Sequence, residues 1–319
     1  MLRGNLSWIP AVTSGPPGRV KLFTRRHAWT TESEEPTITL APAVQPGVFR
    51  PQIHLPTSLG GLVDVIAELR EPRPARRLIM PGGKVELAIF LDATELDEFY
   101  MGWDEQADRG RRKDFSLLFS VANRPQIVSA RKIHILLALM SPAAAMLMFS
   151  IPASELTNRS VNPESLGIHM TPLQDRLNAL PTFSLRAQFL EQWMLNRIRR
   201  VTEAPRFLGL SRRMVDLFGD GRLVADTEQL PNMSGYSPAH ANRLAKQWLG
   251  LSLERYRALQ IYRRALSLLN SPMSLAEVAA TAGYFDQAHF TRTFTKYSGI
   301  SPGHYRTMNR TGADTLHVA

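Results

Sequence analysis

The chain has 319 residues, and 44% of them are hydrophobic, which is enough apolar material for the cores of two domains of ordinary size. It contains no cysteine, so disulfide bonds and thiolate metal sites are excluded, and no apolar stretch follows a basic start, so we expect a cytoplasmic protein without a signal peptide. The net charge of +10 favours a polyanionic partner such as nucleic acid.

Short apolar runs separated by turns dominate the first half of the chain. Residues 1–50 are rich in Pro, Gly and Thr and show little periodicity, so we expect an extended segment there. The runs that follow predict the strands of a small barrel or sandwich. These predicted strands cover residues 62–69, 85–91, 115–121, 133–140 and 145–149, with turns at 81–83 and 123–125.

The longest apolar stretch, residues 135–151, is marginally short for a membrane span. Pro142 and two serines interrupt it, so buried strands joined by a turn are expected and a membrane span is not. The histidines of this half are solitary and give no paired metal-ligand spacing, so we expect no metal, no cofactor and no catalysis. They are His27, His54, His134 and His169. Glu86, in a strand-like run, either meets a ligand or points outward.

An amphipathic helix is predicted after the strands. Its apolar residues recur at steps of four, three, four and four, at Phe183, Ala187, Leu190, Met194 and Ile198. The stripe is shorter than the heptad run of a coiled coil, so it serves either as a dimer seam or as a packing face for the chain's own barrel. A shorter helix at 211–218 and a joint at 219–221 follow.

Capping signals then define a first candidate recognition helix. Ser237 is placed as its N-cap, Pro238 occupies the favoured first position, and Gly250 ends it. Residues 225–234, just before it, contain Pro231, and a proline inside a helix removes a hydrogen bond and clashes with the preceding turn. Any helix over these residues is therefore expected to be short or loose. The predicted buried stripe is Ala241, Leu244, Ala245 and Trp248.

A second candidate recognition helix lies beyond a long amphipathic segment at 253–269. It is preceded by a short helix with a capping box formed by Ser274 and Glu277, and Gly283 closes that helix. Asp286 is placed to cap the second recognition helix, and Gly299 ends it. The apolar face of this helix is Phe290, Phe294 and Tyr297.

The outward faces of the two helices carry no acid. Arg pairs bidentately with guanine and Gln with adenine, as a helix in the major groove requires, although a solvated polar face has the same composition. If the linking helix holds the two about 34 Å apart, one chain reaches two successive major-groove turns. These faces comprise Ala239, His240, Asn242, Arg243 and Lys246 in the first helix and Gln287, Ala288, Thr291, Arg292 and Thr295 in the second.

Basic charge is concentrated in the same segment. Residues 232–310 contain ten Lys or Arg against three acids, a net charge of +7. A basic surface of this kind gains affinity for DNA by displacing counterions from phosphates, and its binding depends strongly on salt. A merely solvated or membrane-surface face is the alternative, but these arginines lie on predicted helices with aromatic cores.

These residues resemble the AraC/XylS class of bacterial transcription regulators. The resemblance covers about the last 85 residues, and its motif is Ala279, 283–287, Phe290, Arg292, Phe294, Gly299, Ser301, Pro302, Tyr305 and Arg306. It implies a double helix-turn-helix domain over 225–310 with a linker helix between the units. By resemblance the DNA-facing positions are Ala239, His240, Asn242 and Arg243 in the first unit and Gln287, Ala288, Thr291 and Arg292 in the second.

Two upstream runs, 80–90 and 141–159, resemble the cupin-like sensor domain of one branch of this class, which carries a PxGxxEL-type motif. The implied fold is α+β. A cupin-like barrel over 51–170 binds a small effector through residues that we leave unassigned. A helical linker with a possible dimerisation role spans 171–224, and a disordered tail spans 311–319.

The expected function is therefore that of a transcription regulator without catalytic activity. It binds double-stranded DNA, responds to a small effector or another subunit, and by family habit activates through RNA polymerase, although repression fits the sequence equally. Alternatives are an architectural protein that bends DNA with weak sequence choice and a barrel enzyme with an accessory DNA module. A homodimer and a monomer both remain open.

Overall fold

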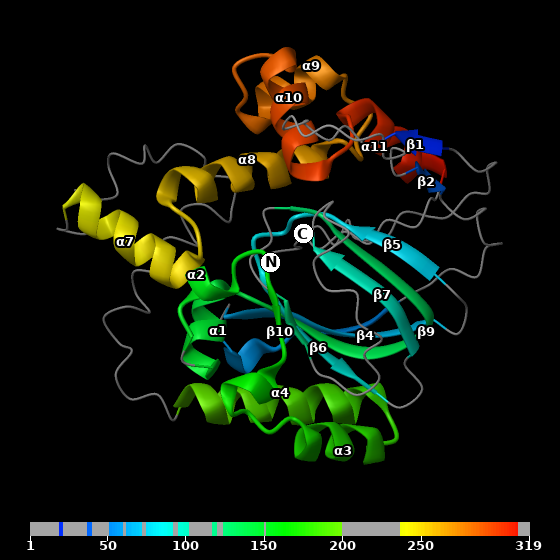
Figure 1. Ribbon diagram of the computed structural model, residues 1–319, viewed down its shortest axis with the longest axis vertical. Helices are drawn as coiled ribbons and strands as arrows, with labels where there is room; N and C mark the ends of the chain where they lie inside the picture. Colours follow the sequence, from blue (N-terminus) through cyan, green and yellow to red (C-terminus); the bar gives the residue numbers. More distant parts are fainter. Residues whose placement is uncertain are drawn as a thin grey trace, which may run out of the picture.

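The computed structural model describes residues 19–21, 37–39, 51–59, 62–71, 75–91, 95–101, 117–119, 124–149, 151–199 and 237–311. A curved antiparallel sheet lies at the centre of Figure 1, with α3 and α4 on one side of it and α7 to α11 on the other. The predicted combination of a sheet and a carboxy-terminal group of helices is thus confirmed. We call β3 to β10 with α1 to α4 the sheet region, and α7 to α11 the carboxy-terminal helices.

The long strand β9 (Gln126–Met140) organises the sheet. Its second half pairs with β4 (Val63–Glu71) on one side and β6 (Val85–Phe90) on the other. Its first half pairs with β5 (Ala75–Ile79) and β7 (Glu95–Met101). The edges are extended by β3 (Gln52–His54), β8 (Leu117–Phe119) and β10 (Ser160–Val161). All of these pairs are antiparallel.

The expected closed barrel is not seen in the part of the chain that the structure describes. The strands follow the open order β10-β8-β6-β9-β4-β3, so β10 and β3 stand at opposite edges instead of pairing. The predictions at 62–69, 85–91, 115–121 and 133–140 correspond to β4, β6, β8 and the second half of β9. Within 1–50, β1 (Arg19–Lys21) pairs with β2 (Thr37–Thr39).

The predicted strand at 145–149 was wrong, because these residues belong to helix α1 (Pro142–Phe149). Ser141 accepts a hydrogen bond from the Ala144 amide at 3.2 Å, and Pro142 occupies the first turn, so the helix has ordinary start signals. Seven of its eight residues are buried. A helix buried on every side shows no polar face, and its sequence therefore has no helical period to detect.

Short helices connect α1 to the amphipathic helix α4 (Phe183–Arg199). They are α2 (Ala153–Leu156), η2 (Pro163–Leu166) and α3 (Thr171–Ala179), whereas η1 (Thr57–Leu59) lies earlier in the chain, between β3 and β4. In α4 the residues Ala187, Leu190 and Met194 are fully buried in the main core. Of the two interpretations of this stripe, packing on the chain's own sheet is therefore the one that the structure supports.

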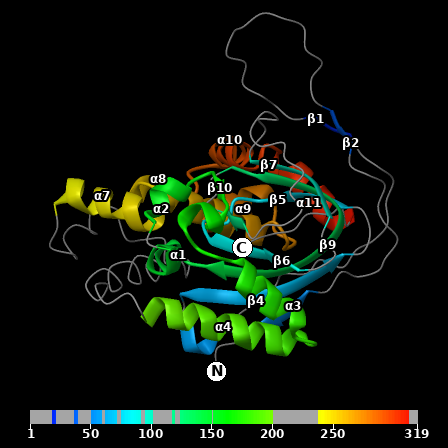
Figure 2. The ribbon, with the colours of Figure 1, turned by 60° about the horizontal axis from the view of Figure 1, so that its bottom comes forward.

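One hydrophobic cluster runs from the sheet into the carboxy-terminal helices. It includes Leu87 and Leu136 in the sheet, Leu190 in α4, and Leu259 and Phe294 beyond them, all fully buried. Figure 2 shows the sheet between α4 and the carboxy-terminal helices. The cluster means that the two parts of the chain share packing and are not merely tethered.

The carboxy-terminal helices are α7 (Pro238–Leu249), α8 (Leu253–Leu268), α9 (Leu275–Ala282), α10 (Gln287–Ser298) and α11 (Pro302–Thr311). Both candidate recognition helices, the linking helix and the short helix before the second recognition helix are confirmed, whereas α11 was not predicted. The predictions at 211–218, 219–221 and 225–234, including Pro231, lie outside the described residues, as does His27.

Candidate nucleic-acid interface

The first recognition helix, α7, begins and ends at the predicted caps. The Ser237 side chain accepts a hydrogen bond from the His240 amide, Pro238 sits in the first turn, and Gly250 closes the helix in the left-handed conformation at φ +78°. The predicted buried stripe, Ala241, Leu244, Ala245 and Trp248, is buried. The inward face of α7 was therefore predictable from its sequence.

The outward face of α7 presents the residues expected to contact DNA, but they are not equally free to do so. Ala239, Arg243 and Lys246 are exposed, while His240 and Asn242 are half-buried. An Arg243 Nη2 atom lies 3.0 Å from Nδ1 of His240, so these two side chains are positioned together. The Asn242 Oδ1 atom accepts a hydrogen bond from the Leu253 amide at 3.2 Å. Asn242 therefore helps to hold the start of α8, and its amide nitrogen is what remains for DNA.

Residues of the sheet region pack against α7 and form a hydrogen bond to its carboxy-terminal end. Leu244 and Trp248 of α7 share a buried cluster with Ala143 and Leu147 of α1. The Thr157 hydroxyl donates a hydrogen bond to the Gly250 carbonyl at 2.8 Å. A Cβ atom placed on Gly250 would lie 2.7 Å from that hydroxyl oxygen, so the contact requires glycine. Residues outside the carboxy-terminal helices thus contribute to the orientation of the first recognition helix, together with α8.

The second unit, α9 and α10, has the predicted caps. Ser274 and Glu277 form both hydrogen bonds of the capping box, and the bond from the Ser274 amide holds the pKa of Glu277 below its ordinary value. Gly283 closes α9 at φ +100°. Asp286 caps α10 by accepting a hydrogen bond from the His289 amide at 2.6 Å. These bonds fix the turn between the two helices.

Aromatic rings hold α10 in place. Phe290 and Phe294 are fully buried, and their ring centroids are 5.6 Å apart. Phe294 also packs on Tyr262 of α8, at 5.2 Å, and on Tyr305 of α11, at 5.6 Å. Tilted or edge-on ring pairs at these distances are favourable. All the rings come from the carboxy-terminal helices, so the aromatic contacts of the second recognition helix are made within those helices.

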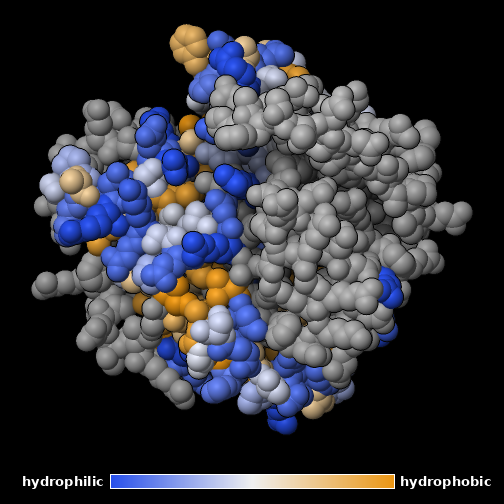
Figure 3. All heavy atoms as spheres, in the orientation of Figure 1, coloured by the Kyte–Doolittle hydropathy of each residue, from blue (hydrophilic) through white to orange (hydrophobic). Residues whose placement is uncertain are grey.

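The outward face of α10 matches the prediction in its exposure. Gln287, Ala288 and Arg292 are exposed and Thr291 is half-buried. The Thr291 hydroxyl donates to the Gln287 carbonyl at 2.9 Å, so its proton is already used within the helix. Two exposed neighbours were not predicted as site residues, namely His289 and Phe285, and the latter is 93% exposed. In Figure 3 hydrophilic residues cover much of α7 and of the unit containing α9 and α10.

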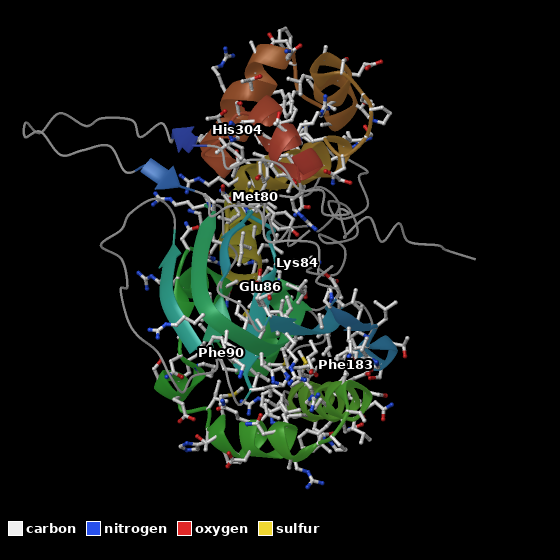
Figure 4. All side chains as sticks on the ribbon, turned by 90° about the vertical axis from the view of Figure 1, so that its right-hand side faces the viewer. Met80, Lys84, Glu86, Phe90, Phe183 and His304 are labelled. Atoms are coloured by element: carbon white, nitrogen blue, oxygen red, sulfur yellow. The ribbon has the colours of Figure 1, made fainter. Side chains whose placement is uncertain are left out.

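The sheet region meets the linking helix α8 beside an ion pair between Lys84 and Asp64. Lys84, just before β6, lies 2.7 Å from an Asp64 carboxylate oxygen, and burial lowers its pKa although Asp64 opposes that shift. The neighbouring Gly83 packs against the Leu259 side chain of α8. Figure 4 shows Met80 and Lys84 at the end of the sheet nearer the carboxy-terminal helices. These contacts place strand ends directly beneath the helix that joins the two recognition helices.

Glu86 resolves one question that the sequence left open, because its side chain is only 8% exposed. Burial raises the pKa of Glu86 to about 7. Among the described residues no group donates a hydrogen bond to its carboxyl. Its register partner on β9 is Leu139, which is also buried. Glu86 is therefore a buried acid in apolar surroundings, and the interpretation that it points outward was wrong.

A second set of buried charges ties α4 to the sheet. Arg186 of α4 makes two hydrogen bonds to the Glu68 carboxylate of β4, at 2.8 and 2.9 Å, and His134 lies 3.0 Å from it. Burial alone raises the pKa of Glu68, but these hydrogen bonds outweigh it and hold that pKa below its ordinary value. His54 contacts Glu191 of α4. Two histidines that appeared solitary in the sequence are therefore partners of carboxylates.

Neither set is a metal site. In the described ranges no group of three or more His, Asp or Glu side chains is arranged to hold a metal ion. Within the same ranges no helix combines the length and the hydrophobicity needed to cross a bilayer. The solvent-facing surfaces of α7 and α10 therefore remain the strongest candidate for a functional site.

Comparison with known proteins decides the family. Residues 230–308 match the family described as a helix-turn-helix domain. The probable transcription factor PqrA from Proteus vulgaris is 36% identical over 89 residues, which make up 28% of this chain and 72% of that protein. The chain belongs to the AraC/XylS family. It is a DNA-binding transcription regulator of the helix-turn-helix type.

Two further proteins are similar to this chain at lower identity. The Arabinose operon regulatory protein from Escherichia coli is 29% identical over 128 residues, and the chain spans 44% of its length. The structure of ToxT from Vibrio cholerae covers 76% of this chain and 97% of its own, at 8% identity and a TM-score of 0.44.

Proposed function

We propose that this AraC/XylS member is a sequence-specific regulator whose two recognition helices enter successive major grooves of one duplex. The observation that carries the proposal is the arrangement of α7 and α10 at opposite ends of α8 (Figure 1), each with an outward face that lacks acidic side chains. Helix-turn-helix proteins read one half-site per recognition helix, and half-sites are spaced by about one helical turn.

The proposed DNA-contacting residues divide into three groups. Arg243 and Arg292 suit guanine, whose two major-groove acceptors pair with a guanidinium, and Gln287 suits adenine. We assign Lys246 and His240 to phosphates, which Lys and other polar side chains commonly contact to fix a protein's register on the duplex. Short side chains bring the backbone close to the groove and leave room for methyl contacts. These are Ala239, Ala288 and Thr291, together with Asn242, whose carbonyl is engaged with α8.

We further propose that the sheet region senses a small effector in the manner of the cupin-like branch. Its signal would reach DNA through α1, α2 and Thr157, which hold the end of α7. An effector that binds one arrangement of these parts better than another shifts the population toward it. Glu86 is the proposed polar contact, because a hydrogen-bond donor on the ligand would offset the free-energy cost of its buried carboxyl group.

The remaining proposals follow what is common among members of the family. The regulator acts in the cytoplasm without catalysing a reaction, and it activates transcription through contact with RNA polymerase. A dimer would use a surface other than the apolar stripe of α4, because that stripe is buried in the chain's own core. The domain boundaries at residues 51, 171 and 225 are part of the same proposal.

Selection of binding sites from random duplexes by the full chain tests this function. We expect a motif with two conserved blocks about 10 base pairs apart, centre to centre. Uniform recovery of A·T-rich duplexes would instead support the architectural alternative, because such proteins read deformability and groove width and make few base contacts. A single conserved block would contradict reading by α7.

A further inference from the structure

Phe285 is an exposed aromatic residue beside the second recognition helix. It lies in the turn between α9 and α10, immediately before the N-cap Asp286, and it is 93% exposed. Single exposed apolar residues are common on protein surfaces and need no explanation by themselves. The position of Phe285 makes it informative, because the residues that follow it, Gln287 and Ala288, are exposed at the amino-terminal end of α10.

The turn holds Phe285 in this outward position. The amides of Gly283 and Tyr284 both donate to the Ala279 carbonyl, and the Asp286 side chain accepts from the His289 amide. The preceding ring, Tyr284, occupies the inward position, where it is 7% exposed and packs 5.1 Å from Phe290. Two successive aromatic residues thus point in different directions. The aromatic core is already filled by Tyr284, so Phe285 stays in solvent.

The chemistry of the ring limits what it recognises on DNA. In helix-turn-helix complexes the amino-terminal residues of the recognition helix contact base edges. A phenyl ring has no charge for a phosphate and no donor or acceptor for a base edge. The apolar group that the major groove offers is the 5-methyl group of thymine, and phenylalanine is among the side chains that contact it.

We propose that Phe285 is a specificity-determining residue that packs against the 5-methyl group of a thymine next to the bases read by Gln287 and Ala288. The proposal rests on the proposed function, because it requires α10 to lie in the major groove. It adds a preference that the hydrogen-bonding residues of α10 do not supply, namely thymine over an otherwise identical base without the methyl group.

The test uses the full-length protein and the site recovered by selection. Each thymine of the second half-site is replaced in turn by deoxyuridine, which differs only by the missing methyl group, and affinity is measured by fluorescence anisotropy. At one thymine or two adjacent thymines we expect a loss of about fourfold for the unaltered protein, which is the effect of exposing one methyl-sized group. Phe285→Ala should bind the thymine and deoxyuridine duplexes equally. Phe285→Leu, which stays apolar, should keep part of the preference.

Leu185→Ala is the matched control, because Leu185 is an exposed apolar residue on α4, away from the recognition helices. This variant should behave like the unaltered protein on every duplex. The proposal is overturned if Phe285→Ala retains the thymine preference, or if it binds all duplexes more weakly by one common factor, which would indicate a sugar contact. It is also overturned if DNA binding is unchanged and only transcription with purified polymerase falls. Failure of the unaltered protein to select any sequence would instead defeat the proposed function.

Discussion

The two recognition helices have the same capping pattern but different supports. Helix α7 rests on α1 and α2, with Trp248 and Leu244 against Ala143 and Leu147 and a hydrogen bond from Thr157 to Gly250. Helix α10 packs its Phe294 ring on Tyr262 of α8 and Tyr305 of α11, both within the carboxy-terminal helices. Contacts of α7 thus reach the sheet region directly, whereas the ring contacts of α10 lie within the carboxy-terminal helices. Under the proposed function, a rearrangement of the sheet region would therefore change the position of α7 more than that of α10.

The largest expected effect comes from removing the Phe294 ring, which holds α10 in place. Phe294→Ala removes a fully buried ring that packs on Tyr262 and Tyr305. We expect the free energy of unfolding of the carboxy-terminal helices to fall by about 3–5 kcal/mol, measured by urea denaturation, and binding to the second half-site to be lost. Phe285→Ala is the stability control, because Phe285 is an exposed aromatic residue nearby. If this variant lost a comparable free energy of unfolding, the stabilising role of the buried ring cluster would be contradicted.

The next prediction concerns Glu86, a buried acid in the sheet region, and the pH dependence of the free energy of unfolding. Burial raises the pKa of Glu86 from 4.5 to about 7, so the folded protein favours the protonated carboxyl. The free energy of unfolding should fall as pH rises from about 4.5 to about 7 and stay reduced above that range. Glu86→Gln should remove this contribution and stabilise the protein by about 3 kcal/mol at pH 8, with little change at pH 4.

Urea denaturation across this pH range measures the contribution of Glu86. The exposed Glu155→Gln is the matched control and should keep the pH dependence of the unaltered protein. A Glu86→Gln variant with an unchanged slope between pH 4.5 and 7 would show that burial does not raise the pKa of Glu86 in the folded protein.

A smaller effect is expected from Arg292, and it tests whether α10 contacts bases. Arg292→Ala should weaken binding to the selected site by about 1–3 kcal/mol and relax the choice at one base pair, whereas binding to unrelated duplexes should change much less. Anisotropy titrations on both kinds of duplex at one salt concentration measure the difference. Equal losses on both would make Arg292 a phosphate contact.

The smallest effect tests the support of the first helix. Thr157→Val removes the hydroxyl that donates to the Gly250 carbonyl, a change of about 1 kcal/mol. Footprinting should show weaker protection of the first half-site and unchanged protection of the second. Thr157→Ser keeps the hydroxyl and should behave like the unaltered protein. If Thr157→Val weakened both half-sites alike, the two helices would not be independently supported.

Local signals predicted the carboxy-terminal helices well. Ser274, Glu277, Asp286 and Gly299 act within one turn of chain, so their roles can be read from spacing alone. Contacts between distant residues could not be predicted in this way. The bond from the Leu253 amide to Asn242 joins residues eleven apart, and that from Thr157 to Gly250 joins residues ninety-three apart. The preference for Asn242 as a base reader therefore overlooked its support of α8.

Two further differences have physical causes. Helix α1 was predicted as a strand because residues buried on every side show no period. Phe285 was overlooked because a single turn residue adds nothing to a periodic pattern, and its exposure depends on Tyr284 occupying the core. The site could be assigned to two helices from sequence, but which side chains are free on those helices depends on tertiary contacts.

Gly250 has a consequence for building hybrid regulators. Any side chain at this position would press on the Thr157 hydroxyl and the Ala153 carbonyl, 2.7 and 2.9 Å from the added carbon. A carboxy-terminal half transplanted from another family member will pack on this amino-terminal half only if it has glycine at the equivalent position. One residue thus serves as a compatibility criterion for exchanging the carboxy-terminal helices between family members.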